Sequence, residues 1–145
     1  MYEAGETKPQ REVTDEQGVK YSLVHSGDNV YYNVTGYADN SAERVTIPTH
    51  LLGFDVLYIS DNAFVNSTAI KWLYIPETVT CNYKSTAFAG CSFTLALNQQ
   101  TISGWSNCTF ITGLELGDAV ETISNRAFSE CTGIQKVAIP KNVAM

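Results

Sequence analysis

The sequence carries little charge, and little of that charge is positive. Its 145 residues include nine Lys and Arg against 15 Asp and Glu, which gives a formal net charge of −6. Because no basic stripe runs along the chain, nucleic acid is not an expected partner. Apolar runs are also short, and none approaches the roughly 20 residues that a membrane-spanning helix requires. The chain is therefore expected to contain no membrane span.

The sequence is also poor in residues that could catalyse a reaction or hold a metal. Neither of its two histidines, His25 and His50, is linked by a motif to a cysteine, so no thiol nucleophile has an evident base. The four cysteines form no Cys-x-x-Cys pair and no Cys/His zinc spacing. Glycine-rich phosphate loops are absent as well. We therefore expect neither enzyme activity nor a cofactor.

The first residues lack the apolar stretch of a signal peptide. Residues 1–15 are polar and are predicted to form a flexible leader. In residues 16–44, by contrast, apolar and polar residues alternate on both sides of the turn-forming segment 26–29, which predicts a β-hairpin. We expect this hairpin to cap the repeats that follow, and residues 52–56 to form a loop between the first two units.

Repetition dominates the remainder of the chain, residues 45–145. Aromatic anchors recur at Phe64, Phe88, Trp105 and Phe128. An Ile or Leu follows each anchor, and one more precedes the first anchor. These five residues are spaced 28, 22, 19 and 23 positions apart, at Ile47, Ile75, Leu97, Leu116 and Ile139. A unit of this length cannot bury its own apolar face and must stack on a neighbour. The spacing therefore predicts a solenoid of four to five rungs.

Each unit contains one short segment in which buried and exposed positions alternate with period two, as in a strand. We predict one parallel sheet with strands near 45–47, 72–75, 94–97, 113–116 and 136–139. The inward-facing pairs are predicted to be Leu73/Ile75, Leu95/Leu97, Leu114/Leu116 and Val137/Ile139. The four aromatic anchors are expected to stack in one buried column. Helix content should be low, because only a tight Ala-Phe turn precedes each strand.

The most complete repeat is the last, formed by residues 127–131 and 137–140 with Val143. Its pattern, A-F-x-x-C-x-x-I-x-x-V-x-I-P-x-x-V, resembles the BspA-like leucine-rich repeats of bacterial surface proteins. The resemblance covers about residues 45–145, and the third repeat departs from it with Trp105 in place of Ala-Phe. It implies a mainly β leucine-rich-repeat solenoid with short turns, extracellular or at the cell surface. It also implies a role in recognition or adhesion without catalysis.

Cys91, Cys108 and Cys131 occupy one repeat position, which is Ser67 in the first repeat. A small side chain that packs inward explains this position best, so the three thiols are expected to be free and buried. The alternatives are a metal site and a disulfide between neighbouring rungs, whose parallel Cβ vectors suit a disulfide poorly. Cys81 lies outside the repeat register and has no assigned role. We expect a thiol reagent to reach Cys81 at most.

The outward positions of the predicted strands form a candidate binding surface. They include two large aromatics, Trp72 and Tyr74, and polar residues of the following strands, Thr94, Glu115 and Lys136. Aromatic side chains are over-represented in binding hot spots. We expect a protein or extracellular-matrix ligand here. The alternatives are a carbohydrate ligand, a structural spacer within a larger surface protein, and local cover of the two aromatics by a loop or by the N-terminal hairpin.

The last predicted strand is followed by residues 141–145, which contain no polar capping unit. Val143 takes an inward position there, and no further Ala-Phe turn follows to cover it. We expect the repeats to continue in a longer protein, or this end to self-associate or pair with another molecule.

Overall fold

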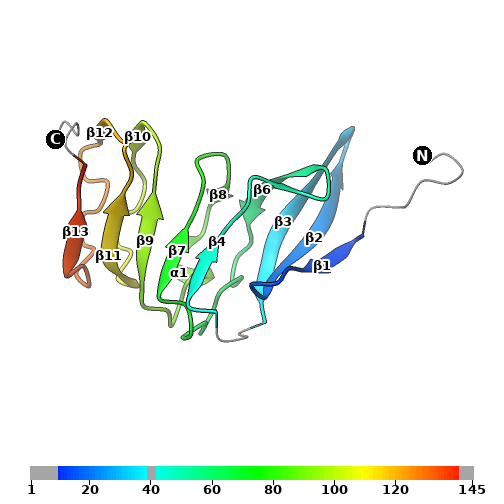
Figure 1. Ribbon diagram of the computed structural model, residues 1–145, viewed down its shortest axis with the longest axis horizontal. Coiled ribbons are helices and arrows are strands. Elements are labelled where there is room, and N and C mark those ends of the chain that lie inside the picture. Colours follow the sequence, from blue (N-terminus) through cyan, green and yellow to red (C-terminus); the bar gives the residue numbers. More distant parts are fainter. Residues whose placement is uncertain (1–9, 39–41, 141–145) are drawn as a thin grey trace, which may run out of the picture.

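The computed structural model describes residues 10–38 and 42–140. Five strands of this part form a parallel sheet, here called the repeat sheet: β4 (Arg44–Thr46), β7 (Trp72–Tyr74), β9 (Phe93–Leu97), β11 (Ile111–Leu116) and β13 (Lys136–Ala138). They follow one another along the long axis of the molecule in chain order (Figure 1). The predicted parallel sheet and the predicted strand positions are confirmed. The fold is a mainly β solenoid.

The inner face of the repeat sheet forms one side of the hydrophobic core. The strand register aligns Leu73, Leu95, Leu114 and Val137 in one ladder. The first three are buried, as predicted, whereas Val137 is 49% and its partner Ile139 44% exposed. The prediction of burial is therefore wrong for the fourth pair. Among the described residues, no strand beyond β13 covers the last rung, and residues 141–145 with Val143 lie outside the described part.

Short strands on the opposite side of the core form two parallel pairs, here called the back strands. They are β6 (Phe54–Ile59), β8 (Thr80–Cys81), β10 (Thr101–Ile102) and β12 (Thr122–Ile123). β6 pairs with β8 and β10 pairs with β12, in both cases in parallel. Cys81 pairs with Ile59 and is buried. This residue therefore has the structural position that the sequence analysis could not assign, in the back strand of its repeat.

The N-terminal hairpin extends the back strands and not the repeat sheet. Its strands are β2 (Val19–Ser26) and β3 (Asn29–Tyr37), and β3 pairs in parallel with β6. β1 (Glu12–Thr14) adds an antiparallel strand to β2, so the end of the expected flexible leader is ordered. Residues 52–56 also differ from the expected loop. β5 (His50–Leu51) and β6 form a second hairpin around Leu52 and Gly53, which have positive φ angles of 50° and 88°.

Asp15 and Gln17 close the exposed edge of the repeat sheet. The carboxylate of Asp15 accepts hydrogen bonds from the backbone N–H of Gln17 and Val19 and from the Tyr21 hydroxyl at 2.6 Å. The turn fixed in this way presents the Gln17 carboxamide to β4. Its Nε2 donates to the Thr46 carbonyl at 3.0 Å, and its Oε1 accepts from the Thr46 N–H at 2.7 Å. One side chain thus substitutes for a neighbouring strand.

The predicted aromatic column exists only in its first half. The rings of Phe64 and Phe88 stack at 5.4 Å with an interplanar angle of 11°. Beyond Phe88, the ring contacts pass to Phe93 and Phe110, at 5.4 and 5.0 Å. Trp105 is buried, but its ring lies against Lys84 instead of Phe88, and Phe128 is only half-buried. The single four-membered column is therefore wrong.

Within the described part of the chain, one helix is present, the single turn α1 (Lys84–Ala87). It immediately precedes Phe88. Low helix content is thus confirmed. The helix lies in the repeat whose anchor, Phe88, contacts Phe93 and Phe110 and not the next anchor.

Substitution of Phe88 by Ala should lower the free energy of unfolding by about 3–5 kcal/mol, because the ring is fully buried between Phe64 and Phe110. Trp72→Ala, on the outer face, should cost about 1 kcal/mol. Urea denaturation monitored by circular dichroism measures both. Equal losses would contradict the assignment of the two strand faces.

Substitution of Gln17 by Ala should lower stability by about 1 kcal/mol, because both hydrogen bonds to Thr46 are lost. Gln100→Ala provides the control, since the Gln100 side chain is exposed. Chemical denaturation of the two variants side by side is the measurement. If they prove equally stable, the Gln17 carboxamide does not close the sheet edge.

Candidate functional site

The outer face of the repeat sheet carries the two columns of side chains that strand alternation predicts. The first column contains Arg44, Trp72, Thr94, Gly113 and Lys136, and the second Thr46, Tyr74, Ala96, Glu115 and Ala138. All five candidate binding residues therefore lie on one face. The two aromatics and Thr94 are half-buried, whereas Glu115 and Lys136 are exposed.

Trp72 is held in place by charged residues of the same face. Its Nε1 donates to Glu115 Oε2 at 3.0 Å, although β9 lies between their strands, so the indole crosses β9. Ala96 is the second-column residue of β9, and its small side chain is buried between Tyr74 and Glu115 in the strand register. The Arg44 guanidinium lies 3.9 Å from the centre of the indole ring. Cover of the aromatic therefore comes from a neighbouring strand, and the two contacts favour this orientation of the indole.

A shallow depression adjoins this cluster on the outer face. It has a volume of about 480 Å³, and Thr94, Glu115 and Lys136 contribute to its lining. At Gly113 the Thr94 side chain occupies the space that a side chain would take: a Cβ on Gly113 would lie 2.7 Å from Thr94 Oγ1. Opposite charges at Glu115 and Lys136 border the depression. Three of the five predicted site residues thus come together in one concavity.

A second concavity, which the sequence analysis missed, originates from unequal segment lengths. In the first and fourth repeats, the aromatic anchor follows the last back-strand residue by five positions, from Ile59 to Phe64 and from Ile123 to Phe128. The corresponding distances are seven in the second repeat, from Cys81 to Phe88, and three in the third, from Ile102 to Trp105. Neighbouring turns of such different length cannot stack in register.

Hydrogen bonds locate the resulting break. The Phe64 N–H donates to the Ala87 carbonyl and the Trp105 N–H to the Ala127 carbonyl, each at 2.8 Å. Among the described residues, no backbone hydrogen bond joins the turn at Phe88 to the turn at Trp105, and β8 does not pair with β10. The repeat sheet nevertheless continues across this junction, from β9 to β11.

The hydrogen-bond acceptors of the repeat cysteines also differ at this break. Cys91 Sγ donates to the Phe64 carbonyl at 3.0 Å, and Cys131 Sγ to the Trp105 carbonyl at 2.9 Å, in each case the anchor of the preceding repeat. The equivalent acceptor for Cys108 would be Phe88, but its Sγ turns to the Ser106 carbonyl of its own repeat, at 3.6 Å. The four cysteines are free thiols. Three are buried as expected for an inward position, but they are Cys81, Cys91 and Cys108, and Cys131 is partly exposed.

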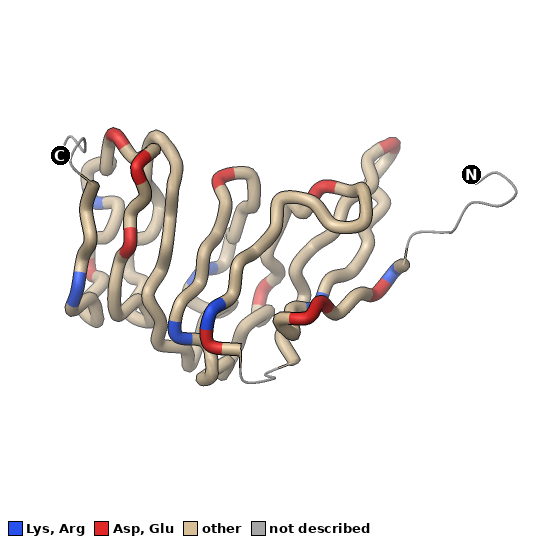
Figure 2. Tube along the Cα trace, viewed as in Figure 1, with Lys and Arg blue, Asp and Glu red and all other residues tan. Residues whose placement is uncertain are grey.

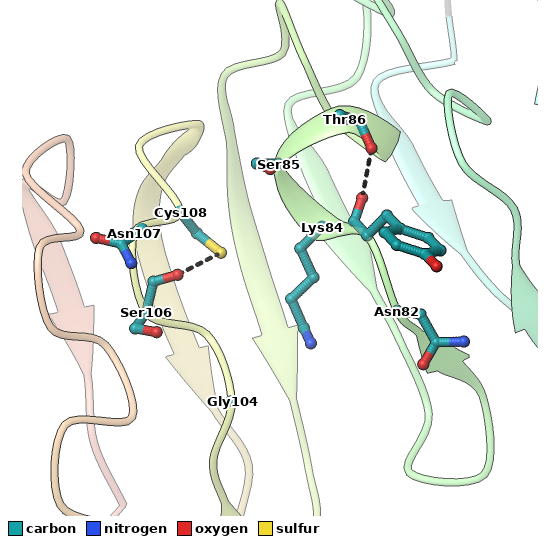
Figure 3. Close-up of a pocket in the computed structure, with 9 residues that line it drawn as sticks. Asn82, Lys84, Ser85, Thr86, Gly104, Ser106, Asn107 and Cys108 are labelled. Carbon is teal, nitrogen blue, oxygen red and sulfur yellow. Dashed lines mark hydrogen bonds between the residues drawn. The ribbon is translucent and has the colours of Figure 1, made fainter.

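The break opens a cleft of about 330 Å³, here called the junction cleft, between α1 and the turn at residues 104–108. The Lys84 side chain extends between these two walls (Figure 3). Its Nζ donates to the Cys81 carbonyl at 3.1 Å and lies 4.9 Å from the centre of the Trp105 ring. Most of its lining residues carry polar side chains, and no signal in a single repeat points to it. Comparison of the segment lengths of neighbouring repeats would have found it.

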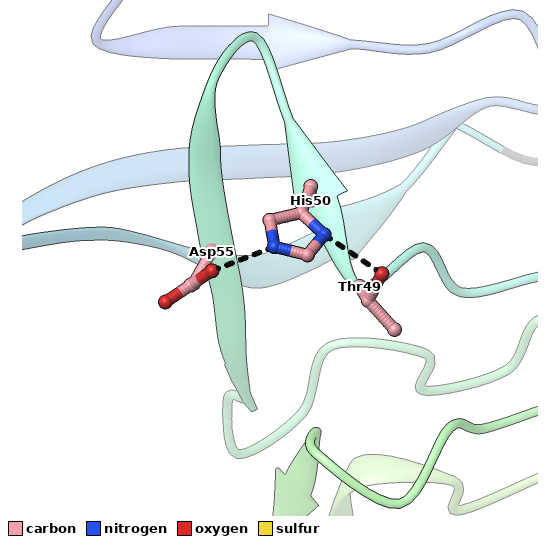
Figure 4. A network of polar contacts seen from close by, with 3 residues as sticks. All are labelled: Thr49, His50 and Asp55. Carbon is pink, nitrogen blue, oxygen red and sulfur yellow. Dashed lines mark hydrogen bonds and ion pairs between the residues drawn. The ribbon is translucent and has the colours of Figure 1, made fainter.

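Both histidines are exposed, as predicted, and one belongs to a small polar network (Figure 4). His50 Nε2 lies 3.0 Å from Asp55 Oδ1, and its Nδ1 lies 2.9 Å from Thr49 Oγ1. The His50 and Asp55 side chains are 69% and 61% exposed, so this contact contributes at most about 1 kcal/mol. It fastens the β5–β6 hairpin.

The distribution of ionisable groups adds no further centre. In the described part of the chain, no group of three or more His, Cys, Asp or Glu side chains is arranged to hold a metal ion. Lys and Arg positions are spread over several strands and turns along the solenoid (Figure 2). No helix in residues 10–38 and 42–140 has the length and hydrophobicity needed to cross a bilayer.

Comparison with known proteins identifies the repeats. A family model described as BspA type leucine-rich repeat region, in six copies, matches residues 35–145. No curated protein matches the chain.

Solved structures resemble the chain, and the first two below share its fold, with TM-scores of 0.50 or more. A leucine-rich repeat protein from T. pallidum is 19% identical with a TM-score of 0.52, over 90% of this chain and 62% of that protein. A leucine-rich repeat protein from Bacteroides capillosus is 14% identical with a TM-score of 0.50, over 88% of this chain and 97% of that one. A leucine-rich cell surface protein from Faecalibacterium prausnitzii is 19% identical with a TM-score of 0.42, over 94% and 44%. The chain thus spans less than two thirds of the T. pallidum protein.

Thiol labelling should distinguish the cysteines, with Cys131 reacting first because it alone is partly exposed. Burial raises the pKa of Cys81 to about 11 and that of Cys108 to about 12, so few thiolates form at these positions near neutral pH. Maleimide labelling of the native protein followed by peptide mass analysis gives the order. Cys131→Ser should remove the fast phase. Faster labelling of Cys81 than of Cys131 would contradict the structure.

Proposed function

Because the chain belongs to the BspA-type leucine-rich repeat family, we propose that it is a non-catalytic recognition module of the cell surface. It binds a protein or extracellular-matrix ligand through the outer face of the repeat sheet. The proposed contact residues are Trp72, Tyr74, Thr94, Glu115 and Lys136.

The observation that carries this proposal is the depression of about 480 Å³ beside the Trp72 cluster. Trp and Arg are enriched among the residues that dominate protein interfaces. Here Arg44 and Glu115 hold the indole of Trp72 in one orientation before any ligand arrives, which reduces the entropic cost of binding. Glu115 and Lys136 place opposite charges at the border, which suits a partner that carries both signs.

Carbohydrate is the alternative ligand for this face. Stacking on a sugar ring requires a free aromatic face, and the Arg44 guanidinium already occupies one face of the Trp72 indole. Tyr74 remains half-exposed in the neighbouring column. The geometry of this cluster therefore favours a protein ligand over a sugar. A third alternative, a structural spacer, predicts no ligand at all.

Binding to printed arrays of purified extracellular-matrix proteins and of glycans tests these alternatives. Thr94→Arg fills the depression, and Lys136→Glu replaces the positive charge at its border by a negative one. Each change should weaken protein binding about tenfold or more. Glu121→Lys is the control, because this exposed residue precedes the back strand β12.

Thermal unfolding of each variant confirms that the fold is retained. Binding to glycans alone would support the alternative ligand. Absence of binding on both arrays, or equal loss in the Glu121→Lys control, would contradict recognition through the outer face.

The expected association of the C-terminal end with another molecule stays a prediction. The exposed side chains of Val137 and Ile139 in the last described rung are the surface on which such a contact would form.

A further inference from the structure

The junction cleft is independent of the proposed binding face. Its walls come from α1 and from the turn at residues 104–108, whereas the depression on the outer face is lined by β9, β11 and β13. None of the residues that line one concavity lines the other. A ligand in the cleft would contact residues that occur once in the solenoid, because the cleft exists only at the junction where the turns fall out of register.

One positive charge is fixed in this cleft. Of the described residues that line it, Lys84 alone is charged, in a protein of net charge −6. The Cys81 carbonyl accepts one hydrogen bond from Nζ, and the Trp105 ring lies on another side of it. An ammonium group has three donors, so the bond to Cys81 and the contact with Trp105 leave one side of it for a ligand. Among the residues that the structure describes, no carboxylate forms a salt bridge with Lys84.

The surrounding groups are hydroxyls and carboxamides. Ser85, Thr86, Ser106, Asn82 and Asn107 line the cleft with donors and acceptors, and its volume of about 330 Å³ is at the lower end of the range for small-molecule sites. Such a lining suits a small ligand rich in hydroxyl groups, and the ammonium requires that this ligand be an anion.

We propose that the junction cleft binds an acidic saccharide, through a sugar residue whose carboxylate or sulfate pairs with Lys84. The hydroxyl groups of the sugar bind the serine and asparagine side chains around it. Charge-assisted hydrogen bonds to the ammonium supply most of the selectivity, because a neutral sugar leaves the Lys84 charge without a partner.

Two carboxylates near the cleft bear on this assignment. Asp61, in the turn of the preceding repeat, accepts a hydrogen bond from the Thr86 hydroxyl. Glu77 lines an adjoining concavity that also includes Lys84. Its negative charge competes with the ligand, so Glu77→Gln should strengthen the binding of an anionic sugar.

Titration of the ¹⁵N-labelled protein with glucuronate, glucose 6-sulfate, glucose and inorganic sulfate tests the proposal. The acidic sugar that binds should shift the amide resonances of residues 82–86 and 104–108 saturably, up to about 20 mM, with a dissociation constant in the millimolar range. Glucose should bind at least about tenfold more weakly. The two acidic sugars separate a carboxylate from a sulfate ligand.

Variants identify the residues. Lys84→Gln should weaken binding of the acidic sugar about tenfold. Because this change also removes the contacts of Lys84 with Cys81 and Trp105, a second variant places a negative charge in the cleft without touching them. Asn107→Asp keeps a residue type that tolerates the positive φ of 63° at this position and should abolish binding.

Asn66→Asp is the matched control. Asn66 lies two positions after the anchor Phe64, just as Asn107 lies two positions after Trp105, and its φ of 58° is similar. Asn66 nevertheless lies outside the cleft. The control should leave binding unchanged.

Four results would overturn the proposal. They are absence of saturable shifts with both acidic sugars, equal affinity for glucose and glucuronate, equal affinity for glucose 6-sulfate and inorganic sulfate, and equal loss of binding in Asn66→Asp and Asn107→Asp. None of them bears on ligand binding by the repeat sheet.

Discussion

The fold depends on the requirement that stacked rungs advance in step on both sides of the core. Parallel strands pair at a spacing of about 4.8 Å, and a solenoid must keep that spacing in the repeat sheet and in the back strands at once. The repeat sheet meets the requirement from β4 to β13. The back strands fail it between β8 and β10, where turn segments of seven and three residues meet. The helix α1 and the junction cleft both lie at this junction.

Aromatic packing holds the solenoid together at the junction. Where the turns separate, the aromatic core is completed by Phe93 and Phe110, whose rings contact Phe88 and each other at 5.0 to 5.4 Å. Both residues belong to segments of the repeat sheet or directly before it, so the front half of the solenoid supplies the rings that the back half lacks. Buried aromatic area therefore replaces the backbone hydrogen bonds that the break removes.

The sequence predicts those parts of the fold that repeat, and it fails where one repeat differs from the next. The alternation in each strand was sufficient to place Trp72, Glu115 and Lys136 on one face. It could not show that the indole reaches across β9, because that depends on the small side chain of Ala96 in the neighbouring rung. Alignment on the aromatic anchors also hid the break. Cys81 and Leu97 are as far apart in sequence as Ile59 and Ile75, so Phe88 is displaced within a repeat of ordinary length.

A regular solenoid presents the same positions in every rung, so its surfaces are extended and repetitive. A pocket with a unique set of residues requires a departure from the repeat. The displacement of Phe88 is such a departure, and it costs little stability because the repeat sheet continues beside it. Lys84 begins the single-turn helix in the lengthened turn of the second repeat, and no other repeat has a helix there in the described part of the chain. The outer face and the junction cleft therefore arise from opposite properties of one chain, the first from repetition and the second from its interruption.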